Sequence, residues 1–455
     1  MHKRWGVAAL LSAWNHLTTG SVNRKIFGAA VTVALFTALV KVAYVVQELV
    51  VAWLFGTGDA PDAFLVAFML PTFLVYVVAE SFHVALIPTY IQVREQEGLK
   101  AAQRLVSSMM LWSLGILGIT TLLMVIAAPL YLPVIARGFS SEKLALTEHL
   151  LYTLAPLVIL KGIAVIGRAV LNAGEKFIFA AFSPIVTPVL AVIFLLLGDR
   201  DWGIFPLAFG FVSGTALEVI LLATALKKRG IGLHLRWCGF SPHMRQVASQ
   251  YVPMVVGAFL MGSTTLVDQS MAAMLSPGSV AALNYGSKVV AFPLYLAATA
   301  LGIAVVPYFS QMIAQADWLG VRHTLSRYLG LIFAITVPLT IILIIFSKPL
   351  VQALFQRGLF TAQDTDTVAV IQGFYALQLP FYIAGILVVR LISSIQANQI
   401  LMEAAFYNLL ANVILNYLFI QYLGVAGIAL STAIVYLISF IYCWFMLKKQ
   451  IPKME

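Results

Sequence analysis

Charged residues are scarce in this sequence. Asp, Glu, Lys and Arg together make up 10% of the 455 residues, whereas apolar residues make up 61%. A soluble globular domain carries about 25% charged residues, so the composition excludes that class and predicts a protein that lives in a lipid bilayer. Cysteine is also rare. Cys238 and Cys443 belong to no C-x-x-C pair and give no sign of a disulfide framework or a zinc site.

Motifs for catalysis and nucleotide binding are missing as well. The sequence contains no G-x-x-x-x-G-K-[ST] loop, no cluster of metal ligands and no nucleophile arranged with a base. We therefore expect neither an enzyme nor a cofactor. The net charge of +10 is a feature shared with nucleic-acid-binding proteins, and it must first be tested against membrane topology.

Apolar runs of membrane-spanning length recur from one end of the chain to the other. A helix needs about 20 apolar residues to cross about 30 Å of hydrocarbon. The runs between polar breaks predict an all-α polytopic protein with about twelve transmembrane helices. They lie near residues 26–55, 62–90, 105–128, 150–171, 178–197, 204–226, 247–275, 280–306, 325–346, 369–392, 404–422 and 425–447.

Basic residues accumulate on one side of these predicted spans. Most of the 28 lysines and arginines lie outside the spans, and most of these fall in alternate segments, including Lys227–Arg229 and Lys448–Lys449. The positive-inside rule then places both termini in the cytoplasm. The basic excess is explained by orientation, so we expect no nucleic-acid partner. Residues 1–25 are interpreted as a basic cytoplasmic lead, too polar for a cleaved signal peptide.

The chain contains an internal repeat. The pattern P-L followed by R-G occurs at Pro129–Gly138 and again at Pro349–Gly358, 220 residues later, and ALIPTYIQ (Ala85–Gln92) matches AVVPYFSQ (Ala304–Gln311) at nearly the same offset. A duplicated six-span unit predicts two six-helix lobes related by a pseudo-twofold axis along the membrane normal. The predicted division is an N-lobe at 26–226, a basic linker at 227–246, a C-lobe at 247–447 and a tail at 448–455.

The stretch FGTGDAPDA (Phe55–Ala63) has two interpretations. A G-x-G-D sequence beside a span resembles intramembrane aspartyl proteases, in which two carboxylates share a proton. Such proteases need a second aspartate on another helix, usually in a Tyr-Asp pair, and this sequence contains none. Gly56, Gly58 and Pro61 are turn formers. We therefore favour a turn in which Asp62 caps the second predicted span.

Ionisable residues inside the predicted spans are costly and usually face a cavity or a partner. The spans contain five cations and four anions over both halves, which predicts a water-accessible cavity suited to a polar or anionic solute. Those residues are Lys41, Glu48, Glu80, Lys161, Arg168, Glu218, Asp268, Lys288 and Arg390. Lys41, Tyr44, Gln47 and Glu48 share one helical stripe. Glu218, Arg168 and Arg390 lie near span ends, where they can extend toward the surface or support packing.

Several stretches resemble the MurJ/MviN family of the multidrug/oligosaccharidyl-lipid/polysaccharide exporter superfamily. They are FGTGDAPDAFLVAFMLPTFL, Ala79–Glu80, GSVAALNYGSKV (Gly278–Val289) and LFQRGLFTAQDT (Leu354–Thr365). The resemblance implies a monomeric flippase in the bacterial inner membrane. It would carry an undecaprenyl-pyrophosphate-linked saccharide from the inner to the outer leaflet by alternating access of the two lobes, in contact with membrane lipid.

The sequence departs from the family pattern at positions that bear on the substrate. Gln47 stands where the family has an arginine, Val75–Tyr76 replaces an arginine pair, and Ser287–Lys288 replaces Asp-Arg. The resemblance implies that such arginines engage the pyrophosphate, whereas lysine offers a point charge without the bidentate fork. These departures favour a related saccharide, such as an exopolysaccharide repeat unit, over lipid II itself.

These observations lead to a set of expected roles. The headgroup-binding candidates are Lys41, Lys288, Lys161 and Gln47; the candidates for coupling or charge pairing are Glu48, Glu80 and Asp268; and the lobe-interface or structural candidates are Arg168, Arg390 and Asp62. Glu48 is expected to pair with Lys41 when no substrate is bound. The alternative function is a cation-coupled small-molecule exporter on the same scaffold, in which the three acidic residues carry the coupling ion.

Overall fold

The structure is a computed structural model that describes residues 22–173, 177–228, 239 and 241–450. Most of the predicted lead, much of the linker and the end of the tail lie outside this part of the chain. Within it, every regular element is helical. The elements are α2 (Val22–Phe55), α3 (Asp59–Leu74), η1 (Val75–Glu80), α4 (Ser81–Glu97), α5 (Leu99–Ile135), α6 (Ser141–Leu154), α7 (Pro156–Ala173), α8 (Phe177–Phe182), η2 (Ser183–Ile185), α9 (Val186–Leu197), η3 (Arg200–Trp202), α10 (Phe205–Lys227), α11 (Pro242–Ala273), α12 (Ser279–Ala314), α13 (Trp318–Ile345), α14 (Ser347–Phe355), α15 (Ala362–Ala376), α16 (Leu379–Ser394), α17 (Asn398–Leu423) and α18 (Val425–Gln450).

Several spans are built from consecutive helices. Asp59–Glu97 runs through α3, the π-helix η1 and α4, while Ala362–Ser394 joins α15 to α16. Pro380 lies at the start of α16, where a backbone N–H would have no acceptor within the helix, so the proline removes no helical hydrogen bond. In the described part of the chain, eleven helical segments are long and apolar enough to cross a membrane. The 36-residue α12 corresponds to the remaining predicted span. The predicted all-α polytopic fold is confirmed.

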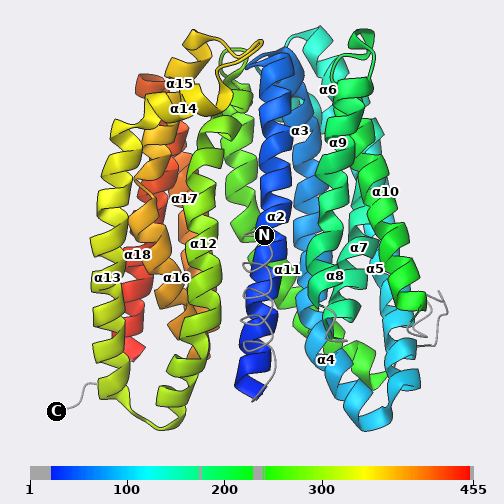
Figure 1. The fold of residues 1–455 in the computed structure, drawn as a ribbon, viewed down its shortest axis with the longest axis vertical. Coiled ribbons are helices and arrows are strands. Elements are labelled where there is room, and N and C mark those ends of the chain that lie inside the picture. The colour runs from blue at the N-terminus through cyan, green and yellow to red at the C-terminus, as the bar shows by residue number, and fades with distance from the viewer. Residues whose placement is uncertain (1–21, 174–176, 229–238, 240, 451–455) are drawn as a thin grey trace, which may run out of the picture.

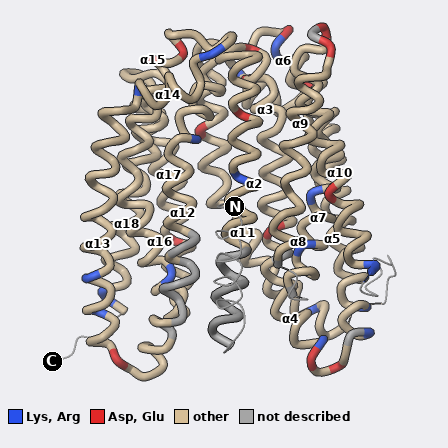
Figure 2. The backbone as a smooth tube through the Cα atoms, viewed as in Figure 1, with Lys and Arg blue, Asp and Glu red and all other residues tan. Residues whose placement is uncertain are grey.

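The helices form two halves that repeat one pattern. Figure 1 shows α3–α10 on one side and α12–α18 on the other, with α2 and α11 between them. Helices α12, α13 and α15 begin about 220 residues after α3, α5 and α6, as the internal repeat predicts. Charged positions gather mainly toward the two ends of the bundle, and few lie at its middle depth (Figure 2).

Helix α11 packs against both halves. Near its start, Met244, Val247 and Tyr251 are buried in the same apolar cluster as α4 and α5. At its end, Ala272 and Ala273 belong to the apolar core of the second half. Because one continuous helix belongs to both cores, α11 joins the halves along its length.

The halves meet closely at the end of the bundle that contains the loop after α2, which we call the closed end. The Leu359 N–H donates to the carbonyl of Trp53 at 3.0 Å, and a Cβ added to Gly358 would lie 2.2 Å from the same oxygen. The repeat partner of this contact is Gly138 against Ala273, where an added Cβ would lie 2.6 Å from the carbonyl oxygen. Glycine at both positions lets the two backbones touch.

Candidate functional site

Asp62 is the polar centre of the closed end. Its side chain is 1% exposed, and its carboxylate accepts hydrogen bonds from the N–H groups of Gly278 at 2.7 Å and Ala281 at 2.8 Å. These donors belong to the N-terminus of α12, where a helix has no acceptors of its own. The expectation that Asp62 caps the second span is wrong. Because α3 begins at Asp59, Asp62 lies inside the first turn and caps a helix of the opposite half instead.

Lys143 neutralises the charge of this cap. Its ammonium lies 2.8 Å from carboxylate oxygens of both Asp59 and Asp62, and it is itself buried against the Phe139 ring. The two aspartates therefore share a cation, whereas a protease pair would share a proton. Thr57 and Asp364 add a further hydrogen bond between the halves nearby.

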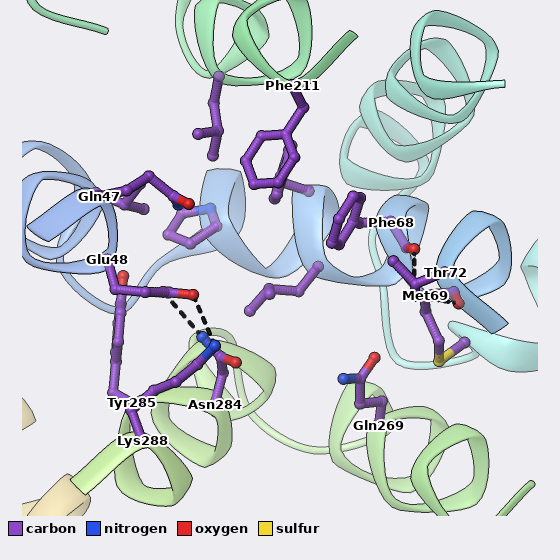
Figure 3. A pocket seen from close by; sticks show the side chains of 15 residues that line it. Gln47, Glu48, Phe68, Met69, Thr72, Phe211, Gln269, Asn284, Tyr285 and Lys288 are labelled. Carbon is purple, nitrogen blue, oxygen red and sulfur yellow. Dashed lines mark hydrogen bonds and ion pairs between the residues drawn. The ribbon is translucent and has the colours of Figure 1, made fainter. Parts of the chain in front are cut away.

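An ion pair between the halves lies beneath the closed end. Glu48 of α2 accepts from the Lys288 ammonium at 2.9 Å and from the Asn284 amide at 3.2 Å, both on α12 (Figure 3). Tyr285 places its hydroxyl 3.3 Å from the carbonyl of Gly56. The expected pairing of Glu48 with Lys41 is not what the structure shows, because one turn of α12 presents Lys288 and Asn284 directly to the carboxylate.

These groups line a cavity of about 190 Å³ between the halves. Phe64, Phe68 and Phe211 form one wall, with ring centroids 5.0 to 5.8 Å apart. Gln47 and Gln269 contribute amide groups from α2 and α11 (Figure 3). The cavity therefore combines an aromatic wall, three amide side chains and one neutralised ion pair, and the helices that carry them come from both halves.

Lys41 lies outside this cavity lining, nearer the start of α2. Its ammonium lies 5.2 Å from the ring centroid of Tyr295, a cation–π contact with α12, and it is close enough to Lys288 for the two positive charges to interact. Of the four predicted headgroup residues, the structure thus brings Gln47 and Lys288 into the cavity lining and places Lys41 outside it, near Lys288. Lys161 is half-buried on α7 and is not among the lining residues.

The remaining predicted residues occupy separate places. Arg168 binds Glu218 at 2.5 Å, and Glu218 is fully buried and also accepts from Ser183 at 3.2 Å. Glu218 therefore does not extend toward the surface, as a position near a span end would allow. Glu80 ends the π-helix η1 and is half-buried, whereas Arg390 is exposed on α16.

Asp268 lies in a second polar cluster, within the C-terminal half. Its carboxylate accepts from the amides of Asn412 and Asn416 at 2.9 and 2.7 Å and from the Thr432 hydroxyl at 3.3 Å. Asn416 Oδ1 has no hydrogen-bond partner within the described chain. Oxygen atoms of these side chains are suited to a hard cation such as Na⁺ or to a proton on the carboxylate.

Sequence reasoning missed Lys143, Asn284, Gln269 and the two asparagines. In the sequence, Lys143 falls between the predicted spans 105–128 and 150–171 and resembles an ordinary loop lysine. Neutral amides inside spans carry less signal than charges. Asn284 could have been found, because it lies one turn before Lys288 within the quoted GSVAALNYGSKV motif.

Comparisons with known proteins agree with this architecture. Residues 51–455 match the family model described as lipid II flippase MurJ. A probable lipid II flippase MurJ from Synechocystis sp. is 26% identical over 445 residues, covering 94% of this chain and 82% of that protein. The lipid II flippase MurJ of Burkholderia cenocepacia is 26% identical over 426 residues, covering 90% and 81%.

Solved structures share the fold. A lipid II flippase MurJ in an inward closed conformation matches with a TM-score of 0.79 at 24% identity, over 92% of this chain and 87% of that one. An inward-facing multidrug resistance transporter of the MATE family matches with a TM-score of 0.74 at 13% identity, over 93% and 98%. Both likenesses concern the two-lobed helical architecture.

Proposed function

The chain belongs to the lipid II flippase MurJ family, and we propose that it moves an undecaprenyl-pyrophosphate-linked saccharide from the inner to the outer leaflet of the bacterial inner membrane. The carrying observation is the polar cavity between the halves, with Glu48 and Lys288 inside it and Lys41 at its approach. A charged, sugar-bearing headgroup cannot enter hydrocarbon without such a path, because each buried charge costs several kcal/mol.

The conformation of the structure, in which the halves touch at the closed end, is the first state of the proposed transport cycle. With both termini in the cytoplasm, as the distribution of basic residues predicts, the closed end faces outward and the cavity is reached from the inside. Outward release then requires the Asp62 cap on α12 and the Trp53–Leu359 contact to separate. In the proposed alternating access, the halves separate at the closed end and come into contact at the cytoplasmic end.

The cavity supports a lipid-linked saccharide of the lipid II or exopolysaccharide type. Lys41 and Lys288 are the charged groups available to a pyrophosphate, and lysine binds it as a point charge without a fork. Lys288 is already engaged by Glu48 at 2.9 Å. An arriving pyrophosphate would compete with Glu48 for this ammonium, so that substrate exchange replaces one ion pair with another and avoids an unpaired buried charge.

Two energy sources are proposed: the membrane potential acting on the charge of the headgroup, and an ion gradient acting through the Asp268 cluster. A headgroup with about two negative charges moves outward down an inside-negative potential, worth about 2.3 kcal/mol per charge per 100 mV. Asp268, held by two asparagines and Thr432, is proposed as the site where a coupling cation or proton binds. Collapsing the membrane potential in proteoliposomes while keeping the ion gradient separates the two contributions.

The proposal is tested by flipping assays in proteoliposomes that contain fluorescent undecaprenyl-pyrophosphoryl saccharides. Lys41→Ala and Lys288→Ala should each lose most of the transport, and replacement by arginine should retain more than alanine, because the positive charge is needed. Lys348→Ala is the matched control, since this exposed lysine pairs with the exposed Asp366 at the surface. Normal flipping by both alanine variants would reject the headgroup assignment.

A second measurement separates this function from a small-molecule exporter. A strain lacking a flippase should lose envelope polysaccharide or cell-wall precursor at the outer leaflet. Sensitisation to cationic compounds with intact envelope synthesis would instead support the exporter.

A further inference from the structure

The cavity beneath the closed end contains buried polar atoms that require hydrogen-bond donors. Gln47 is 3% exposed, and its Oε1 has no partner in the part of the chain that the structure describes; the same holds for Oε1 of Gln269. Both side chains line the cavity, from α2 and α11 (Figure 3). An amide oxygen only accepts hydrogen bonds, and leaving it unpaired in a buried place is unfavourable. A ligand that brings N–H or O–H groups would supply the donors that these two oxygens lack.

The charges in the cavity oppose an anion beside Gln47 and Gln269. Both oxygens of Glu48 already have partners on α12, one in the Lys288 ammonium and the other in the Asn284 amide. This carboxylate neutralises the single lysine of the lining, and the other lining residues are uncharged. A pyrophosphate has only acceptor oxygens at neutral pH, so it would face Gln47 Oε1 and Glu48 without a hydrogen to share.

The opposite wall offers apolar faces. Phe64, Phe68 and Phe211 lie together, and none of them competes for hydrogen bonds. The cavity volume of about 190 Å³ equals about six water molecules at about 30 Å³ each, which is the scale of one sugar ring. A sugar ring has C–H faces that pack on aromatic rings and hydroxyl groups at its edge that donate to amide and carboxylate oxygens.

We propose that the part of this cavity beside Gln47 and the three phenylalanines is a saccharide subsite, which receives the first sugar of the lipid-linked substrate while the pyrophosphate stays beside Lys288 and Lys41. Gln47, Gln269 and Glu48 accept from the sugar's hydroxyl or acetamido groups, and the three phenylalanines pack on its ring. The inference rests on the proposed function, since it assigns a part of that substrate to a part of that cavity.

The spacing along α2 agrees with this division. Lys41 precedes Gln47 by six residues, which is about 9 Å at about 1.5 Å per residue, farther from the closed end. In a polyprenyl-pyrophosphate-linked sugar the pyrophosphate joins the sugar to the lipid. A headgroup entering with its sugar foremost would place the pyrophosphate near Lys41 when the sugar reaches Gln47.

The test compares two purified lipids, undecaprenyl pyrophosphate and undecaprenyl-pyrophosphoryl N-acetylglucosamine, in binding titrations with the full chain in detergent. The wild-type protein should bind the sugar-bearing lipid more tightly. Gln47→Leu should reduce that preference by about three- to tenfold, the value of roughly one hydrogen bond, and leave the affinity for the sugar-free lipid unchanged. Because the substitution removes a buried unpaired amide, the protein should stay folded, which a melting curve checks.

Two variants sharpen the comparison. Lys41→Ala should weaken the binding of both lipids equally, since both carry the pyrophosphate, whereas Gln269→Leu should reduce the sugar preference as Gln47→Leu does. Equal binding of the two lipids by the wild-type protein would overturn the subsite and leave the flippase proposal standing. A parallel loss of both lipids in Gln47→Leu would place the pyrophosphate beside Gln47 and overturn the inference. Failure of the wild-type protein to bind either lipid would overturn both proposals.

Discussion

Replacing Asp62 by alanine should open the closed end of the molecule. The substitution removes two charge-assisted hydrogen bonds to the N-terminus of α12, at 2.7 and 2.8 Å, and one of the two carboxylates that bind the buried Lys143. A hydrogen bond to a charged group contributes about 1.5–3 kcal/mol, and breaking a buried ion pair costs about 3–5 kcal/mol. Because Asp59 remains beside Lys143, we expect a loss near the lower value, about 3 kcal/mol.

This free energy stabilises only the state in which the halves touch at this end. Its loss should therefore shift the equilibrium toward the opened state by about 100-fold. The shift can be measured as a distance distribution between spin labels at Glu142 and Gln363, two exposed positions at the closed end in opposite halves, after Cys238 and Cys443 have been replaced by alanine. A second, longer distance should dominate in Asp62→Ala.

The matched control is Asp59→Ala. Asp59 contacts the same lysine at 2.8 Å, but its side chain is 62% exposed. Exposed ion pairs contribute about 0–1 kcal/mol, so this variant should keep the wild-type distances. If Asp62→Ala also kept them while remaining folded, the cap across the halves would not hold the closed end, and the reasoning from its hydrogen bonds would be refuted.

Three further variants test other parts of the structure. Glu218→Gln should lower the free energy of unfolding by about 3–5 kcal/mol, because it leaves a largely buried arginine without its anion. Thermal melting should show no such loss for Glu148→Gln, whose half-exposed side chain accepts a hydrogen bond from the neighbouring Tyr152. Gly358→Ala should prevent closure, since its Cβ would collide with a backbone oxygen at 2.2 Å; Gly98→Ala shares the positive φ but meets nothing within 4 Å, so only the first should lengthen the spin-label distance. Asp268→Asn should abolish the dependence of flipping on an ion gradient, and an unchanged dependence in proteoliposomes would remove Asp268 from coupling.

The sequence by itself determined the membrane location, the helical class and the duplication. These properties depend on composition and on runs of about 20 apolar residues, both of which are local along the chain. The turn at Phe55–Ala63 was also predictable, since Gly56, Gly58 and Pro61 favour it whatever surrounds them. The helices of the structure contain the predicted spans to within two residues, and several extend about five to nine residues beyond them, as α5 does at both ends.

Only the tertiary structure decided which polar groups meet. Asp62 caps a helix that begins more than 200 residues later, and Glu48 pairs with Lys288 and not with Lys41 on its own helix. Such partners depend on the rotation and depth of one helix against another, which arise from packing over the whole bundle and leave no periodic signal in either segment. A stripe of residues shows which face of a helix avoids lipid, but the atoms opposite that face belong to another part of the chain.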